Sequence, residues 1–231
     1  MFDAKKFSGK IFIDMDGTLN FHQTKVKEYL ENWLKYKFDK DIRDIKWFQD
    51  IIPFEEPALR EYTMFKIYSI PNFWLSLKPD TRSANTLKSW IDNGYKIVIL
   101  TATPPRENMS AETLEHLGGE EFFNQIADSK IKWLKQNYKE IDWDDTSKVE
   151  FKCVRTLNKY DFVEPNSIVI DDKSPFGPST NKYHKGCLWI RIGLENRKND
   201  GVNPDIYLSN WSKAKKVVSW RLRKVDSWIW L

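Results

Sequence analysis

One short stretch near the start of the chain constrains the fold more than any other. Residues Lys10–Ile13 are compact, β-branched and aromatic, and turn signals bound them, which is typical of a buried strand. Asp14 and Asp16 follow, one residue apart, and Gly17 then lets the backbone bend. Residues i and i+2 of a strand point the same way, and two close carboxylates need a cation or a shared proton. The stretch therefore indicates a metal site, an acid–base role, or both.

The composition is that of an ordinary globular protein. With 231 residues, of which 30% are charged and 41% apolar, the chain fits one domain with an insertion. The net charge of +4 is too small to argue for nucleic-acid binding. The sequence contains no apolar run of the roughly 18 residues that a membrane span needs, and residues 1–25 show no secretory signal. We therefore expect no membrane partner. Cys153 and Cys187 lack metal or redox spacing, which predicts a reducing, cytoplasmic location.

The region directly behind the first strand predicts a small helical cap. Apolar residues recur at three and four positions over residues 24–38, and a second helix is expected over residues 55–68. Residues 71–74 (PNFW) interrupt this pattern. We therefore assign residues 20–76 to a cap inserted after the first strand.

A regular alternation of helices and strands follows the cap. It predicts an α/β fold with a doubly wound, mostly parallel sheet, whose core comprises residues 1–19 and 77–231. Strands are expected at residues 96–100, 149–154, 167–170 and 187–192, and helices at residues 80–91, 108–117 and 128–138.

The last stretch, residues 209–231, predicts a basic amphipathic helix that ends in a tryptophan-rich apolar tail. One interpretation is a helix that closes the sheet and a tail that packs on it. The other is a tail that docks a partner or a second copy of the chain, so a homodimer stays open.

Polar residues gather where the predicted strands end. Ligands of open α/β sheets bind at the carboxyl ends of the strands, where Asp14 and Asp16, then Thr101, then Asp171 and Asp172 are expected. Such oxygen ligands suit Mg²⁺ together with a substrate phosphate. One carboxylate could then attack phosphorus, while a second protonates the leaving oxygen and later activates water.

These residues resemble motifs of the haloacid-dehalogenase (HAD) superfamily of phosphotransferases. Residues 14–19 (DMDGTL) resemble its DxDGT motif, Thr101 its second motif, and residues 168–172 (IVIDD) its fourth. The order and the spacing of the three motifs also fit. The resemblance implies a HAD-like Rossmannoid core.

Within the superfamily, the chain is most similar to the 5′(3′)-deoxyribonucleotidases of phage and bacterial type. The resemblance extends over about residues 10–192 and is loose in the middle. It rests on four segments: residues 71–79 (PNFWLSLKP), 94–101 (GYKIVILT), 129–134 (SKIKWL) and 170–173 (IDDK).

The resemblance implies a role for each matched residue. Asp14 would be the nucleophile and a metal ligand, and Asp16 the general acid/base, whose backbone carbonyl also reaches the metal. Asp171 would be the third metal ligand, with Asp172 as its alternative or its support. Thr101 and the amide of Ala102 would hold phosphate oxygens. Lys159 best matches the third-motif lysine, while Lys152 and Lys130 stay open as alternatives. Phe73 and Trp74 would stack on a nucleobase, or simply pack the cap.

The resemblance implies a Mg²⁺-dependent phosphomonoesterase that hydrolyses (deoxy)nucleoside monophosphates through an aspartyl-phosphate. A second hypothesis keeps this chemistry but takes phosphorylated DNA or RNA ends, with the basic C-terminal helix as the discriminating feature; nucleic acid is the less favoured partner because the net charge is small. A third is a non-catalytic HAD-fold binding module.

Overall fold

The computed structural model describes residues 2–34, 66–104, 109–156, 159–172, 186–193 and 205–223. Within these ranges, one sheet of six strands has the order β3-β2-β1-β4-β5-β6, and every neighbouring pair is parallel. The strands are β1 (Lys10–Ile13), β2 (Lys96–Ala102), β3 (Val149–Val154), β4 (Ile168–Asp171), β5 (Leu188–Ile192) and β6 (Ile206–Leu208).

This strand order confirms the predicted doubly wound, parallel α/β sheet. From β1 the chain moves outward to β3 in one direction, and from β4 it moves outward to β6 in the other. The order therefore reverses between β1 and β4, which is where sheets of this kind bind ligands.

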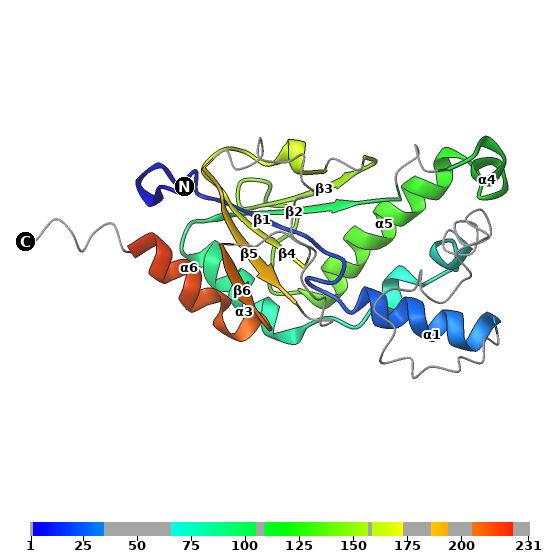
Figure 1. Cartoon of the computed structure of the whole chain (residues 1–231), viewed down its shortest axis with the longest axis horizontal. Helices are drawn as coiled ribbons and strands as arrows, with labels where there is room; N and C mark the ends of the chain where they lie inside the picture. Colours follow the sequence, from blue (N-terminus) through cyan, green and yellow to red (C-terminus); the bar gives the residue numbers. More distant parts are fainter. Residues whose placement is uncertain are drawn as a thin grey trace, which may run out of the picture.

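Helices connect and flank the strands. The α-helices are α1 (His22–Leu34), α3 (Thr81–Asp92), α4 (Ala111–His116), α5 (Glu120–Asn137) and α6 (Ala214–Arg223). Short 3₁₀ helices lie at η1 (Ala4–Lys6), η4 (Trp74–Ser76), η6 (Lys159–Phe162) and η8 (Trp211–Lys213). In Figure 1, α1 lies at one end of the molecule and α6, which packs along α3, at the other.

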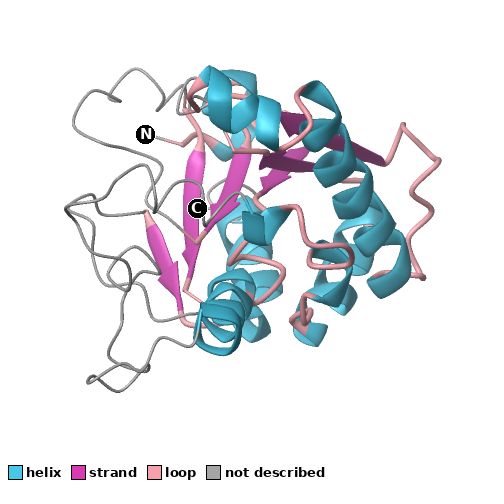
Figure 2. Ribbon diagram, turned by 90° about the vertical axis from the view of Figure 1, so that its right-hand side faces the viewer, coloured by secondary structure: helices cyan, strands magenta, loops and turns pink. Residues whose placement is uncertain are grey.

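Alternation along the strands divides the core between the two faces of the sheet. In β1, Ile11 and Ile13 belong to the larger apolar cluster, whereas Phe12 belongs to a smaller one. Buried residues of α3, α5 and α6 join the larger cluster, and most helical ribbons in Figure 2 gather on one side of the strands. Because both faces of β1 are covered, its strand signal in the sequence is a continuous apolar run.

Trp211, at the start of η8 just before α6, connects the C-terminal region to the loop that follows β1. It is fully buried, its ring lies 6.0 Å from that of Trp90 in α3, and its Nε1 donates a hydrogen bond of 2.7 Å to the backbone oxygen of Thr18. The start of the predicted closing helix is therefore part of the core. The predicted tail beyond residue 223 lies outside the described residues.

Several predicted boundaries change. Strand β6 was not predicted, because three residues are too few for a periodic signal. Helix α5 begins at Glu120 rather than at residue 128, since Gly119, with φ of +64°, precedes it and Phe122 and Phe123 are already on its buried face. Helix α1 confirms the first predicted cap helix as far as Leu34, and residues 35–65 of the predicted cap lie outside the described residues.

Among the described residues, none of the helices combines the length and the apolar character that crossing a bilayer would require.

Replacing Trp211 with phenylalanine tests the link to the β1 loop. We expect Trp211→Phe to lower the free energy of unfolding by about 1–3 kcal/mol, because the backbone oxygen of Thr18 loses its donor inside the core. Urea unfolding measures the change. As a matched control, Trp220→Phe in the following helix α6, at a side chain 49% exposed, should stay within about 0.5 kcal/mol of wild type. Equal effects of the two substitutions would contradict this role of Trp211.

Candidate active site

Pairing between the two central strands brings the predicted carboxylates together. The backbone N–H of Asp14, the residue after β1, donates to the backbone oxygen of Ile170 at 2.9 Å. Asp14 therefore lies beside Asp171, the last residue of β4. Thr101 lies near the carboxyl end of the other neighbour of β1, strand β2. The sheet therefore places these residues at one edge, as the sequence predicts.

Gly17 allows the loop after β1 to pass close to Asp172. Its φ is +83°, and a Cβ at this position would overlap the Asp172 carboxylate. Its N–H donates to Asn20 Oδ1 at 3.2 Å, and the hydroxyl of Thr18 donates to Asp14 Oδ2 at 3.4 Å. The turn thus requires glycine both for its backbone conformation and for the space that the carboxylate occupies.

Three of the predicted metal residues form one cluster. Asp14, Asp171 and Asp172 are all buried, and each offers a carboxylate oxygen within 4.8 Å of the others. A donor set made only of carboxylate oxygens fits a hard cation such as Mg²⁺. These three residues would hold the ion.

Lys159 neutralises part of this cluster. Its Nζ lies 2.5 Å from Asp14 Oδ1 and 2.9 Å from Asp171 Oδ2, and the Tyr160 hydroxyl donates to Asp171 Oδ2 at 2.9 Å. Burial alone would lower the pKa of Lys159, yet the two carboxylates hold it well above its ordinary value. Lys159 therefore remains a cation, and its role as the third-motif lysine stays a prediction.

Burial controls the ionisation of Asp14. Desolvation is the main cause that raises its pKa from 3.8 to about 6, against the opposing charge of Lys159 and with a further increase from the neighbouring Asp171. The Asp14 carboxylate is therefore costly to ionise until a further cation approaches it.

Asp16 has a different environment because Lys130 holds it. The Lys130 side chain is wholly buried, and its Nζ lies 2.5 Å from Asp16 Oδ2. The same ammonium donates to Thr101 Oγ1 at 2.9 Å and to the backbone oxygen of Ala102 at 2.7 Å. Burial would raise the pKa of Asp16, but Lys130, with a smaller contribution from His22, lowers it below its usual value. The Asp16 side chain thus faces a lysine and not the acidic cluster.

The three lysines that the sequence left open are now distinguished by position. Lys159 and Lys130 both reach the site, whereas Lys152 pairs with Glu150 at 3.1 Å. A helical signal for Lys130 was present in the sequence: Ile126 and Trp133, four residues before and three after it, are both buried on α5. Residues at these spacings share a helix face, so Lys130 belongs to the apolar stripe.

Arg191 is a neighbour of the site that the sequence reasoning missed. This buried side chain of β5 donates from Nε to the backbone oxygen of Asp172 at 3.0 Å. It thereby supports the chain just beyond β4. Its signal is the single charged residue within an otherwise apolar strand, Leu188–Ile192.

Phe73 and Trp74 lie in an aromatic cluster beside the site. Phe73 is fully buried and Trp74 is 4% exposed, with their ring centroids 5.1 Å apart. His22 stacks on Trp74 at 5.5 Å, and Lys130 Nζ lies 4.5 Å from the centroid of the Trp74 ring. Both aromatic residues therefore pack the segment next to the site, and their stacking on a nucleobase stays a prediction.

Comparisons with known proteins bear on the fold. No protein-family model and no curated protein sequence matches the chain. Among solved structures, it is similar to a candidate phosphatase from Clostridium difficile, with a TM-score of 0.52, 13% identity, and 92% of this chain and 99% of that chain covered. It is also similar to a dehalogenase in an intermediate complex, with a TM-score of 0.51, 13% identity, and coverage of 90% and 96%. These likenesses confirm the predicted α/β fold, which the chain shares with both proteins.

The stability of metal-free protein should report the burial of Asp14. A raised pKa means that the native state binds this proton more tightly than the unfolded chain, so the wild type loses stability as the pH rises from 3.8 to about 6. We expect Asp14→Asn to exceed wild type in free energy of unfolding by about 1–3 kcal/mol near pH 8. This difference should shrink at about pH 4.5.

Urea unfolding of both proteins in EDTA, over a range of pH, measures this difference. Asp161→Asn, at an exposed carboxylate of η6, is the matched control and should show no such pH-dependent gain. An Asp14→Asn protein less stable than wild type at high pH would show that burial does not dominate.

Proposed function

We propose that the chain is a HAD-type, Mg²⁺-dependent phosphomonoesterase that hydrolyses (deoxy)nucleoside monophosphates through an aspartyl-phosphate on Asp14. The observation that supports this most is the separation of the two aspartates. Asp14 lies in the acidic cluster with its pKa raised to about 6, whereas Lys130 lowers the pKa of Asp16. Two carboxylates whose environments drive their pKa values apart are suited to different roles.

Asp14 is suited to the attack on phosphorus. The Thr18 hydroxyl and Lys159 bond its two oxygens, which orients the carboxylate. Mg²⁺, held by Asp14, Asp171 and Asp172, would supply the charge that favours the ionised nucleophile and neutralises the substrate phosphate. An oxygen of Asp14 forms a bond to phosphorus as the bond between phosphorus and the leaving oxygen breaks.

Asp16 must carry a proton for this step, although Lys130 keeps it ionised in the free protein. Lys130 also contacts Thr101 and Ala102, the residues proposed to hold phosphate. A phosphate dianion arriving there would compete for the Lys130 ammonium, and the loss of this partner raises the pKa of Asp16. Substrate binding therefore favours the protonated acid.

Asp16 then serves both half-reactions. It donates its proton to the leaving alkoxide, which departs as an alcohol. The resulting carboxylate takes a proton from a water molecule, whose oxygen attacks phosphorus. The bond between phosphorus and Asp14 breaks, and phosphate leaves while the Asp14 carboxylate is restored.

The nucleotide as substrate is the part of the proposal that depends on the resemblance to deoxyribonucleotidases. Its support in the structure is the aromatic cluster of His22, Tyr68, Phe73 and Trp74, which reaches the catalytic edge through Lys130. We propose that residues 20–76 form a cap that selects the substrate from this side.

Helix α6 gives no support to the alternative of nucleic-acid ends. It follows η8, whose Trp211 bonds to the loop after β1, and it packs against η1, which precedes β1. Its later basic residues, such as Arg221, therefore lie toward the amino ends of the strands, away from the carboxylates. The buried acidic cluster also argues against a non-catalytic module, because such a cluster destabilises a fold that makes no use of it.

Phosphate release from a small panel of substrates tests the proposal. The panel holds dUMP, dTMP and a 3′-phosphorylated oligonucleotide, each with Mg²⁺ and with EDTA. We expect Mg²⁺-dependent release from the mononucleotides and little from the oligonucleotide. Preference for the oligonucleotide, with a steep loss of activity in added salt, would establish the alternative substrate.

Two variants separate the mechanism from the substrate. Asp14→Asn should lower turnover by at least about three orders of magnitude while the protein stays folded, because the amide is a poor nucleophile. The matched control, Asp161→Asn, should retain wild-type turnover, since this carboxylate lies exposed in η6. Full activity of Asp14→Asn would refute the mechanism.

A further inference from the structure

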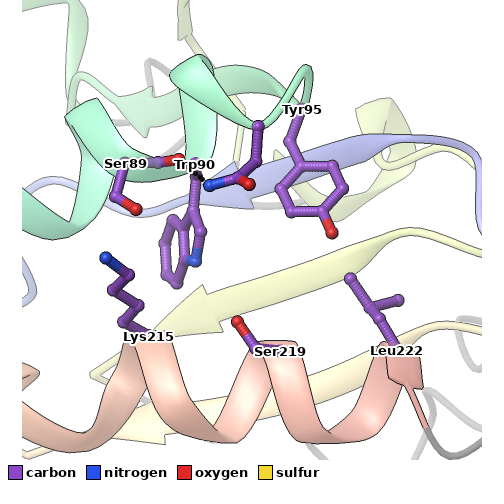
Figure 3. A pocket seen from close by; sticks show the side chains of 7 residues that line it. Ser89, Trp90, Tyr95, Lys215, Ser219 and Leu222 are labelled. Carbon is purple, nitrogen blue, oxygen red and sulfur yellow. Dashed lines mark hydrogen bonds between the residues drawn. The ribbon is translucent and has the colours of Figure 1, made fainter.

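A cavity lies between helices α3 and α6, and Figure 3 shows the side chains that line it. Its volume is about 230 Å³, several times the roughly 30 Å³ that one water molecule occupies in the liquid. It therefore has room for a small organic molecule. Its lining residues are Ser89, Trp90, Asn93, Tyr95, Lys215, Ser219 and Leu222.

Trp90 presents a hydrogen-bond donor to this cavity. The residue is only 1% exposed, and in the described part of the chain no acceptor reaches its Nε1. Figure 3 shows the indole between the two helices, with its nitrogen toward the space that Ser219 and Tyr95 border. A buried tryptophan N–H normally has a partner, and leaving it without one destabilises the fold. The geometry thus favours a ligand with an acceptor atom here.

The charge around the cavity favours an anion as that acceptor. Lys215 lines it and belongs to a helix, Ala214–Arg223, whose sequence has four basic residues and no acidic one. The nearby acidic residue of α3, Asp92, is paired with Lys88 at 2.7 Å. Hydroxyl groups of Ser89 and Ser219 add further donors, and Leu222 provides an apolar wall.

The cavity is separate from the catalytic edge. Tyr95 immediately precedes β2, whereas Thr101 lies near the other end of the same strand. Six residues of extended strand span about 20 Å. A ligand between α3 and α6 therefore leaves the carboxylate cluster accessible.

We propose that this cavity binds a small organic anion, a monocarboxylate or a monophosphonate-like group. Its anionic oxygens accept a hydrogen bond from Trp90 Nε1 and pair with the ammonium of Lys215, while its apolar part contacts Leu222. Because this site lies at the opposite edge of the sheet, it is independent of the proposed phosphatase activity.

Indole N–H signals of the 231-residue chain, labelled with ¹⁵N-tryptophan, test the proposal by NMR. The probes are benzoate for a carboxylate and phenylphosphonate for a phosphate-like group. We expect at least one of them to move the Trp90 signal, assigned from its loss in Trp90→Phe, in a saturable way. Lys215→Ala should weaken this binding about tenfold, because a charge-assisted bond is lost. Lys216→Ala, at an exposed residue outside the cavity lining, should change it less than about twofold.

The signal of Trp74, next to Lys130, distinguishes this site from the catalytic edge. A probe that moves Trp74 and leaves Trp90 unchanged would overturn the proposal. So would the absence of saturable binding for both probes, or equal affinity in wild type and Lys215→Ala.

Discussion

Two lysine ammonium groups inside the protein make the catalytic edge of the sheet stable. Parallel strands deliver Asp14, Asp171 and Asp172 to one small buried volume, and such a concentration of negative charge would oppose folding. Lys159 bridges Asp14 and Asp171, while Lys130 forms an ion pair with Asp16. In the proposed mechanism, this division of the carboxylates between the two lysines gives Asp14 and Asp16 their different roles.

The backbone and the core fix the positions of the residues that form these ion pairs. The bond from Asp14 N–H to Ile170 aligns the ends of β1 and β4, and the positive φ of Gly17 gives the Asp172 carboxylate its space. Beneath the same loop, Trp211 bonds to Thr18. Trp211 therefore helps to position the loop that carries Thr18 and the proposed nucleophile Asp14, although it is far from both in sequence.

Strand periodicity and the rule that ligands bind at strand ends were sufficient to predict the carboxylates and Thr101. Their side chains follow apolar runs that are plain in the sequence. Lys130 could not be assigned in this way, because it lies on a helix and a helical lysine is usually solvated. The apolar stripe of α5 indicates that its side chain is buried, but its contacts with Asp16 and Thr101 appear only in the packed fold. Strand β6 was too short for a periodic signal, and the contact between Trp211 and Thr18 joins residues 193 positions apart. Pairings over such distances are properties of the packed fold and leave no local pattern.

The central claim is that Asp14 becomes phosphorylated during turnover. Rapid quenching of the protein with a nucleoside monophosphate and Mg²⁺, followed by borohydride reduction and peptide mass spectrometry, tests this most directly. The account predicts that the aspartyl-phosphate is trapped as homoserine at position 14, and that Asp16 is not modified. Phosphate release without any modified carboxylate, or modification at another residue, would contradict it.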